Sequence, residues 1–277
     1  MEEKGVAEIG KEHKKIVNTI IEFISSEVES RKSKGVVVGI SGGLDSAVAT
    51  YLAVMALGPK KVFGLILPDS GVTPKRDITH AEDIAKHLGI KYKIIEVGKI
   101  KKLCLDKNLP QGSKLAKANL LVRLRMSLLY FYAAATNRLV LGTGDKSELR
   151  LGYFTKYGDG AADLFPIADL YKTEVRELAH FLSVPKNIAN KKSSARLWKG
   201  HTAEGEIGMS YQEIDRILRE LEKNHGKNYI NGKSFEVSQA IITDRMLNKK
   251  KVKRLVDLIQ RNKHKHEKPP ICKLNRV

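Results

Sequence analysis

The sequence has 277 residues, of which 42% are hydrophobic and 29% are charged, enough for one large α/β domain with a substantial core. Its two cysteines, Cys104 and Cys272, are too few and too far apart for a disulfide framework, a zinc site or an iron–sulfur cluster. The apolar runs are strand-sized and the first residues lack signal-peptide character, so we expect a cytoplasmic protein without a membrane span.

The formal charge of +19 comes from 50 lysines and arginines against 31 acidic residues, and it favours polyanionic partners. A strongly solvated basic surface would explain the same excess. Aromatic residues make up only 6% of the chain, and no basic segment interleaves them as a stacking platform for single strands would. Charge alone therefore does not make nucleic acid an expected partner.

Helical and strand patterns alternate along the first half of the chain. Apolar residues at three- and four-residue steps predict a helix over residues 7–30. Strands are predicted at 35–40, 62–67, 92–97 and 139–141, and the helices between them at 47–57, 77–88 and 119–135. Because each strand reads as continuously apolar, we expect a parallel twisted sheet with helices on both faces and ligands at the carboxyl ends of its strands.

The second half of the chain is mainly helical in pattern. Residues 150–166 form a glycine-rich segment whose length is typical of a functional or mobile loop, and helices are predicted at 172–182, 210–221 and 249–261. We interpret residues 1–277 as a single domain. Its parts are an N-terminal helix (1–34), a nucleotide-binding α/β core (35–200) and a helical C-terminal part with a basic tail (201–277).

The basic stretch over residues 249–268 has two readings. One is a solvated helix face, because Val252, Leu255, Val256, Leu258 and Ile259 supply a buried stripe for the opposite face. The other is an anion contact, for which the lysines and histidines at 263–266, beyond the helix, are the better candidate.

A glycine-rich loop follows the first predicted strand, with the sequence Gly39-Ile40-Ser41-Gly42-Gly43-Leu44-Asp45-Ser46. Paired glycines let successive N–H groups point into one concavity, and the helix that begins near Ser46 adds its positive end, so the loop predicts a phosphate site. The alternative is a turn that binds nothing. The ordinary P-loop has a lysine where this loop has Asp45, and an acid beside phosphates implies a bridging metal ion, Mg²⁺.

Further motifs occur downstream in a fixed order. They are 123–126 (RLRM), 142–148 (GTGDKSE), 154–160 (FTKYGDG) followed by Asp163 and Pro166, 194–198 (SARLW), 206–211 (EIGMSY), and His264-Lys265. The phosphate loop resembles that of the N-type ATP pyrophosphatases, and the ordered set over about residues 35–270 resembles the NAD synthetase family. The resemblance implies a fold like that of the adenine nucleotide alpha hydrolases.

The resemblance also implies an activity: ATP-dependent amidation of deamido-NAD with ammonia through an adenylate, giving NAD, AMP and pyrophosphate. ATP would contact the loop at 39–46 together with Thr143, Lys172 and Ser194. Deamido-NAD would contact Arg125, Lys156, Asp163, His264 and Lys265. Mg²⁺ would be held by Asp45 and Glu148, and the catalytic residues would be Asp45, Lys156 and Asp159, the last near the metal or the incoming ammonia.

Several positions leave alternatives open. Arg123 rivals Arg125 for the substrate contact, and His80, His87 and His180 lie within helical patterns, where a structural role is favoured. Many family members carry Gln-Thr-Asp-Glu where this chain has His201-Thr202-Ala203-Glu204, so one amide and one acid are missing.

The resemblance bears on partners as well. Glutamine-using relatives carry an additional N-terminal amidase domain, whereas only about 34 residues precede the first strand here, so free ammonia is the expected donor and a separate glutaminase subunit is the alternative. The family is dimeric, and residues 113–135 are the candidate contact. The rival functions are an ATP pyrophosphatase that modifies tRNA and a non-enzymatic nucleotide- or RNA-binding module.

Overall fold

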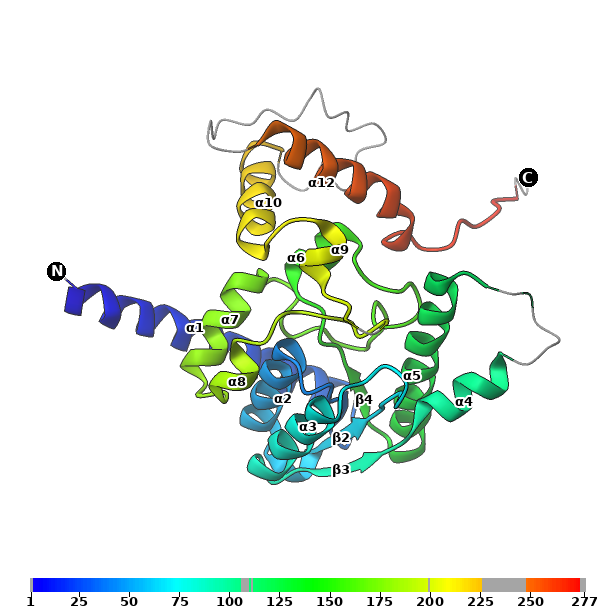
Figure 1. Cartoon of the computed structure of the whole chain (residues 1–277). Helices are drawn as coiled ribbons and strands as arrows, with labels where there is room; N and C mark the ends of the chain where they lie inside the picture. The colour runs from blue at the N-terminus through cyan, green and yellow to red at the C-terminus, as the bar shows by residue number, and fades with distance from the viewer. Residues whose placement is uncertain (1, 106–109, 111, 199, 226–247, 275–277) are drawn as a thin grey trace.

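The computed structural model describes residues 2–105, 110, 112–198, 200–225 and 248–274. A four-stranded parallel sheet forms its centre, in the order β3-β2-β1-β4 (Figure 1). The strands are β1 (Val36–Gly39), β2 (Val62–Ile66), β3 (Lys91–Ile94) and β4 (Leu139–Leu141). The predicted α/β class and parallel sheet are therefore confirmed.

Helices cover both faces of this sheet. Alternate β1 residues enter two different cores: Val36 and Val38 pack with one set of helices, and Val37 packs with the other. The first set contains α1 (Glu2–Ser30), α2 (Leu44–Leu57), α3 (Lys75–His87), α7 (Lys172–Phe181) and α8 (Lys186–Ala189). The second contains α4 (Val97–Cys104) and α5 (Lys114–Thr136), and Figure 1 shows the two sets on opposite sides of the sheet.

Local sequence explains where these helices begin and end. Helix α2 ends at Gly58, which has a positive φ of 76°, and Pro59 starts the short 3₁₀ turn η1 (Pro59–Lys61). Helix α5 begins after Ser113, whose hydroxyl accepts the N–H of Ala116, and ends at Asn137 in the left-handed region. It thus starts five residues earlier than its apolar pattern predicted.

The prediction for the third strand was wrong in two respects. Strand β3 ends at Ile94, and Val97 already begins α4, with Glu96 accepting the N–H of Gly98 as the helix cap. The strand is also not buried: Lys91 and Lys93 are exposed. It lies at the edge of the sheet, where lysines keep the open strand in water.

A third core lies apart from the sheet and joins residues from both halves of the chain. It includes Leu151 and Tyr171 together with residues of the C-terminal helices. Leu151 ends α6 (Lys146–Leu151), and the C-terminal helices are α9 (Ala203–Ile207), α10 (Tyr211–His225) and α12 (Lys249–Asn262), followed by the turn η3 (Lys263–Lys265). In α12 the predicted stripe is buried at Val252, Leu255, Val256 and Ile259. Among the described helices, none is long and apolar enough to cross a bilayer.

We expect Leu52→Ala to lower the free energy of unfolding by about 2–5 kcal/mol. Leu52 lies on α2 and is completely buried in the core, so truncation of its side chain leaves a cavity. Chemical denaturation measures the change. The matched control is Met55→Ala on the same helix, where the side chain is 52% exposed and we expect a change within about 0.5 kcal/mol. Equal losses in both variants would contradict this view of the core.

Candidate functional site

The phosphate loop has the geometry of an anion cradle. Gly42 has a φ of 69°, and a Cβ placed there would lie 2.1 Å from the backbone oxygen of Asp77. The Ser41 hydroxyl lies 2.9 Å from that of Ser46 and accepts the N–H of Gly43, which fixes the turn. Helix α2 then begins at Leu44, and its first N–H groups have no partners inside the helix.

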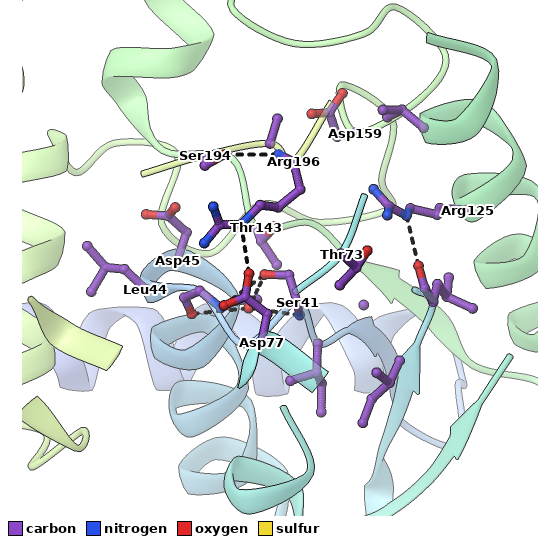
Figure 2. Close-up of a pocket in the computed structure, with 18 of the residues that line it drawn as sticks. Ser41, Leu44, Asp45, Thr73, Asp77, Arg125, Thr143, Asp159, Ser194 and Arg196 are labelled. Carbon is purple, nitrogen blue, oxygen red and sulfur yellow. Dashed lines mark hydrogen bonds and ion pairs between the residues drawn. The ribbon is translucent and has the colours of Figure 1, made fainter. Parts of the chain in front are cut away.

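A cavity of about 240 Å³ opens above this loop, at the carboxyl ends of β1, β2 and β4 (Figure 2). Most of the residues expected to bind ATP or metal line it: Gly39, Ile40, Ser41, Gly43, Leu44, Asp45, Ser46, Thr143, Glu148 and Ser194. Arg125 and Asp159 line it as well. Gly42 lies behind the loop, and Lys172 lies beside the cavity without any exposed surface.

A cluster of three carboxylates surrounds the Lys172 ammonium. Its Nζ lies 2.8 Å from Asp45 Oδ2, 2.5 Å from Asp145 Oδ2 and 2.8 Å from Glu148 Oε1. Burial by itself lowers the pKa of Lys172, but the three acids outweigh it and hold the pKa well above its ordinary value. Lys172 is therefore a fixed cation.

The donor set of this cluster suits a divalent cation. Oxygen atoms of Asp45, Asp145 and Glu148 lie within 4.8 Å of one another, and carboxylates are the ligands that Mg²⁺ prefers. The side chains of Asp45 and Glu148 are about one-fifth exposed toward the cavity, whereas Asp145 is fully buried. Asp45 Oδ1 is buried and has no hydrogen-bond partner in the described part of the chain. Asp45 and Glu148 thus retain the capacity to bind a metal from the cavity side.

The position of Lys172 is secured from the C-terminal helices. Asp215 on α10, which is 1% exposed, accepts the Ser147 hydroxyl at 2.5 Å and the N–H of Thr173 at 2.9 Å. The Ser147 Oγ in turn accepts the backbone N–H of Lys172. One buried carboxylate therefore ties the start of α6, which carries Glu148, to the start of α7, which carries Lys172.

Arg125 and Asp159 form the far wall of the cavity. Arg125 donates from Nε to the Leu67 carbonyl at 2.9 Å, while its rival Arg123 is exposed and donates to the Lys156 carbonyl. Asp159 accepts the N–H of Thr155 at 2.7 Å and is open to solvent through the cavity. Protein atoms still crowd its carboxyl group, and this desolvation raises its pKa above the ordinary value.

Four predicted substrate residues do not line this cavity. Lys265 donates to the carbonyls of Gly152 and Phe154 and lines a neighbouring cavity, of about 570 Å³, which shares Tyr153 and Asp159 with the first. Lys156 Nζ donates to the carbonyl of His264 at 2.6 Å. Asp163 accepts the N–H of Val140 at 2.7 Å, a contact that extends the edge of β4.

His201, one of the departures from the family pattern, is buried and belongs to a hydrogen-bond network that reaches the surface at Glu206. Its Nε2 is 2.8 Å from Glu206 Oε2, and its Nδ1 is 3.2 Å from the Ser194 hydroxyl. Tyr153 donates to the same Glu206 oxygen at 2.6 Å. His201 therefore connects the hydroxyl that was expected to contact ATP with a tyrosine that lines both cavities.

Sequence reasoning missed several residues of the site. Asp145 was quoted only as part of a motif, yet a local signal marked it: it precedes a helix and accepts the N–H of Glu148 three residues later, as a cap does. Asp77, Lys191 and Arg196 also line the cavity. No local signal marks Asp77 and Lys191, and Arg196 was named only within the motif 194–198. Their contacts join residues more than a hundred positions apart.

We expect Lys172→Met to lower stability by about 3–5 kcal/mol, because it leaves three neighbouring carboxylates without their buried counter-charge. We also expect Mg²⁺ to raise the melting temperature of this variant more than that of the unsubstituted protein. Thermal unfolding with and without Mg²⁺ measures both. Lys186→Met, at an exposed lysine, is the control, and an equal effect of the two substitutions would exclude a structural role for the ammonium.

Comparisons with known proteins agree with this site. The NAD synthase family model matches residues 16–269. The NH(3)-dependent NAD(+) synthetase of Archaeoglobus fulgidus is 47% identical over 260 residues, covering 94% of this chain and 97% of the relative.

Among solved structures, the NMN synthetase of Francisella tularensis has a TM-score of 0.78 at 34% identity, covering 95% of this chain and 99% of that one. The NH3-dependent NAD synthetase of Campylobacter jejuni, solved with a nitrate ion, has a TM-score of 0.76 at 33% identity, covering 94% and 99%. With its phosphate loop and acidic cluster in place, the chain belongs to the NAD synthase family.

Proposed function

We propose that this chain, as an enzyme of the NAD synthase family, amidates deamido-NAD with ammonia at the expense of ATP and releases AMP and pyrophosphate. One observation carries the proposal: the phosphate loop, the acidic cluster and Arg125 face one cavity. A pyridine carboxylate is a poor acyl donor, so it must first attack the α-phosphorus of ATP. The resulting mixed anhydride can then be opened by ammonia.

The ATP half of the site would act by positioning and by electrostatic stabilisation. The N–H groups at the start of α2 would hold the departing pyrophosphate, with the hydroxyls of Ser41 and Ser46 beside them. Mg²⁺ bound to Asp45 and Glu148 would neutralise charge on the phosphates. Thr143 and Ser194 are proposed ATP contacts, which their place on the cavity wall supports. Lys172 would hold the acidic side chains in place and add positive charge.

The acceptor half would occupy the far wall and the neighbouring cavity. Arg125 is the proposed contact for the dinucleotide inside the first cavity, and Lys265 lines the second. Asp159 borders both, so a carboxylate that reached the α-phosphate from the second cavity would pass it. Its raised pKa suits a group that accepts a proton from ammonia. Lys156 and His264 are proposed contacts at this end, where Lys156 Nζ donates to the His264 carbonyl. Asp163 is proposed as a contact from its motif alone, because it lies outside the linings of both cavities.

A second acceptor is a mononucleotide. The F. tularensis protein, which covers 95% of this chain, is an NMN synthetase. The fold alone therefore does not decide between a mononucleotide and a dinucleotide acceptor. We favour the dinucleotide, because the relatives at 40–50% identity are NAD(+) synthetases.

Free ammonia is the proposed nitrogen donor. The A. fulgidus relative is NH(3)-dependent and is matched over 97% of its length. The second cavity also borders Asp159, and Asn119 and Glu206 are among the polar residues that line it. We also propose a cytoplasmic location, which is supported by the two cysteines, since neither forms a disulfide bond.

We also propose a homodimer that forms through α4 and α5. Large apolar side chains are exposed on these two helices, with Leu103 at 79% and Phe131 at 72%. Exposed apolar surface of this kind is typical of an interface. The predicted contact region at 113–135 coincides with α5.

We expect the purified chain to convert deamido-NAD, ATP, Mg²⁺ and ammonium into equal amounts of NAD, AMP and pyrophosphate, as chromatography of the products would show. Asp45→Ala and Glu148→Ala should lower kcat by at least about a hundredfold, because each removes a charge that acts on the phosphates. Asp169→Ala, at a side chain that is 99% exposed, is the control.

Other product patterns would identify other functions. ADP and phosphate in place of AMP and pyrophosphate would exclude cleavage at the α-phosphate. Faster turnover of nicotinate mononucleotide than of deamido-NAD would select the mononucleotide reaction. Turnover with glutamine but not with ammonium would exclude free ammonia as the donor. Pyrophosphate release that requires tRNA would favour the tRNA-modifying alternative.

We expect Phe131→Glu to convert a dimer into a monomer, since it places a charge in the centre of the exposed apolar surface of α5. Sedimentation velocity measures the change. Met55→Glu places the same charge on α2, where the side chain is 52% exposed, and should leave the assembly intact. An unchanged sedimentation coefficient in the Phe131 variant would remove α5 from the interface.

A further inference from the structure

Arg196 has a backbone conformation that its side chain does not favour. Its φ is 50°, in the left-handed region that costs energy for a residue with a Cβ. Its N–H is accepted by the Ser194 hydroxyl at 3.1 Å. Strain of this kind persists where surrounding contacts demand it and is concentrated at functional sites, and Arg196 lines the cavity above the phosphate loop.

The side chain of Arg196 is held from one edge only. Its Nε donates to Asp77 Oδ2 at 2.7 Å, and Asp77 is 3% exposed. Neither terminal nitrogen, Nη1 or Nη2, has a hydrogen-bond partner among the described residues. Figure 2 shows Arg196 reaching across the cavity to Asp77, with its guanidinium group above the loop. The fork that suits phosphate oxygens is therefore left free on the cavity side.

Asp77 is tied directly to the phosphate loop. Its backbone oxygen lies where a Cβ of Gly42 would be, and its Oδ1 accepts Lys191 Nζ at 2.9 Å. Lys191 also donates to the Gly42 carbonyl at 2.5 Å and lies 2.7 Å from His80 Nδ1. The hydrogen-bonding capacity of the Lys191 ammonium is thus used by the loop and its immediate neighbours. Arg76 Nε lies 4.0 Å from Asp77 Oδ1, so one carboxylate serves three cations. Positive charge therefore remains beside the anion cradle, and the free donors that face the cavity belong to Arg196.

We propose that Arg196 is a further ATP-binding residue, whose guanidinium contacts the polyphosphate, and that Asp77 is its positioning residue. The proposal rests on ATP being the co-substrate of this cavity. The guanidinium of Arg196 should contact the β- and γ-phosphates of ATP, because it lies over the loop that would hold these two groups. The affinity for nucleotides that lack these phosphates should therefore not depend on Arg196.

The test compares the binding of ATP and of AMP to Arg196→Gly by calorimetry in the presence of Mg²⁺, without the dinucleotide. Glycine accepts the positive φ, so this variant removes the guanidinium without straining the backbone. We expect its Kd for ATP to rise about tenfold to a hundredfold, as for loss of a charge-assisted hydrogen bond, and its Kd for AMP to stay within about twofold. Arg196→Lys should recover only part of the loss.

Two further measurements make the outcome decisive. Lys186→Ala removes an exposed lysine at the start of α8 that has no part in this cluster, and this variant should bind ATP normally. Asp77→Asn should weaken ATP binding in the same selective way. If Arg196→Gly binds ATP within about twofold of the unsubstituted protein, or loses ATP and AMP equally with a lowered melting temperature, the proposal is overturned.

The failure of this proposal can be told from that of the proposed function. If the chain binds ATP through Arg196 but makes no NAD, only the proposed reaction fails. If it makes NAD and Arg196→Gly leaves the KM for ATP unchanged, only the role of Arg196 fails.

Discussion

The ammonium of Lys172, buried among three carboxylates, is the constraint on which the site depends. Its partners come from the starts of two helices: Asp45 is in the first turn of α2, and Asp145 caps α6, whose first turn contains Glu148. Lys172 itself opens α7. Three helix N-termini, each positive, therefore meet at one point. The acids that offset the positive charge of these helix ends also pair with the Lys172 ammonium. Because a buried charge without its partner is costly in free energy, none of the three helices can shift alone.

This arrangement divides the charges around the phosphate loop. Asp45 leads from the loop into the acidic cluster, where carboxylates outnumber the one ammonium. Asp77 lies behind the loop at Gly42, and there three cations share one carboxylate. A bound polyphosphate would thus meet N–H groups from the loop, a metal-binding side and a basic side. Such a division favours an extended, metal-bridged anion over a single phosphate.

The sequence allowed prediction of the parts that depend on neighbours in the chain. The strands β1, β2 and β4 follow from short apolar runs, and the phosphate loop is one contiguous motif. Strand β3 was placed wrongly at its end because Ile95 and Val97 continue its apolar residues although Val97 already begins α4. Helix α6 was missed because six residues carry too little periodicity. The contacts of Asp77 with Lys191 and Arg196 span 114 and 119 residues, so only the folded chain brings them together.

The C-terminal helices, expected as an addition to the nucleotide-binding core, belong to the same construction. Their core contains Leu151 and Tyr171, which flank α6 and α7, so packing of α10 and α12 fixes the helices that bear Glu148 and Lys172. Asp215 also fixes the relative orientation of α6 and α7, because each of its two carboxylate oxygens accepts a hydrogen bond from one of these helices. Hydrophobic contacts alone would tolerate small rotations, whereas a buried carboxylate with two specific donors does not. The charged cluster therefore keeps its geometry because α10 and α12 hold α6 and α7 in place from outside the sheet.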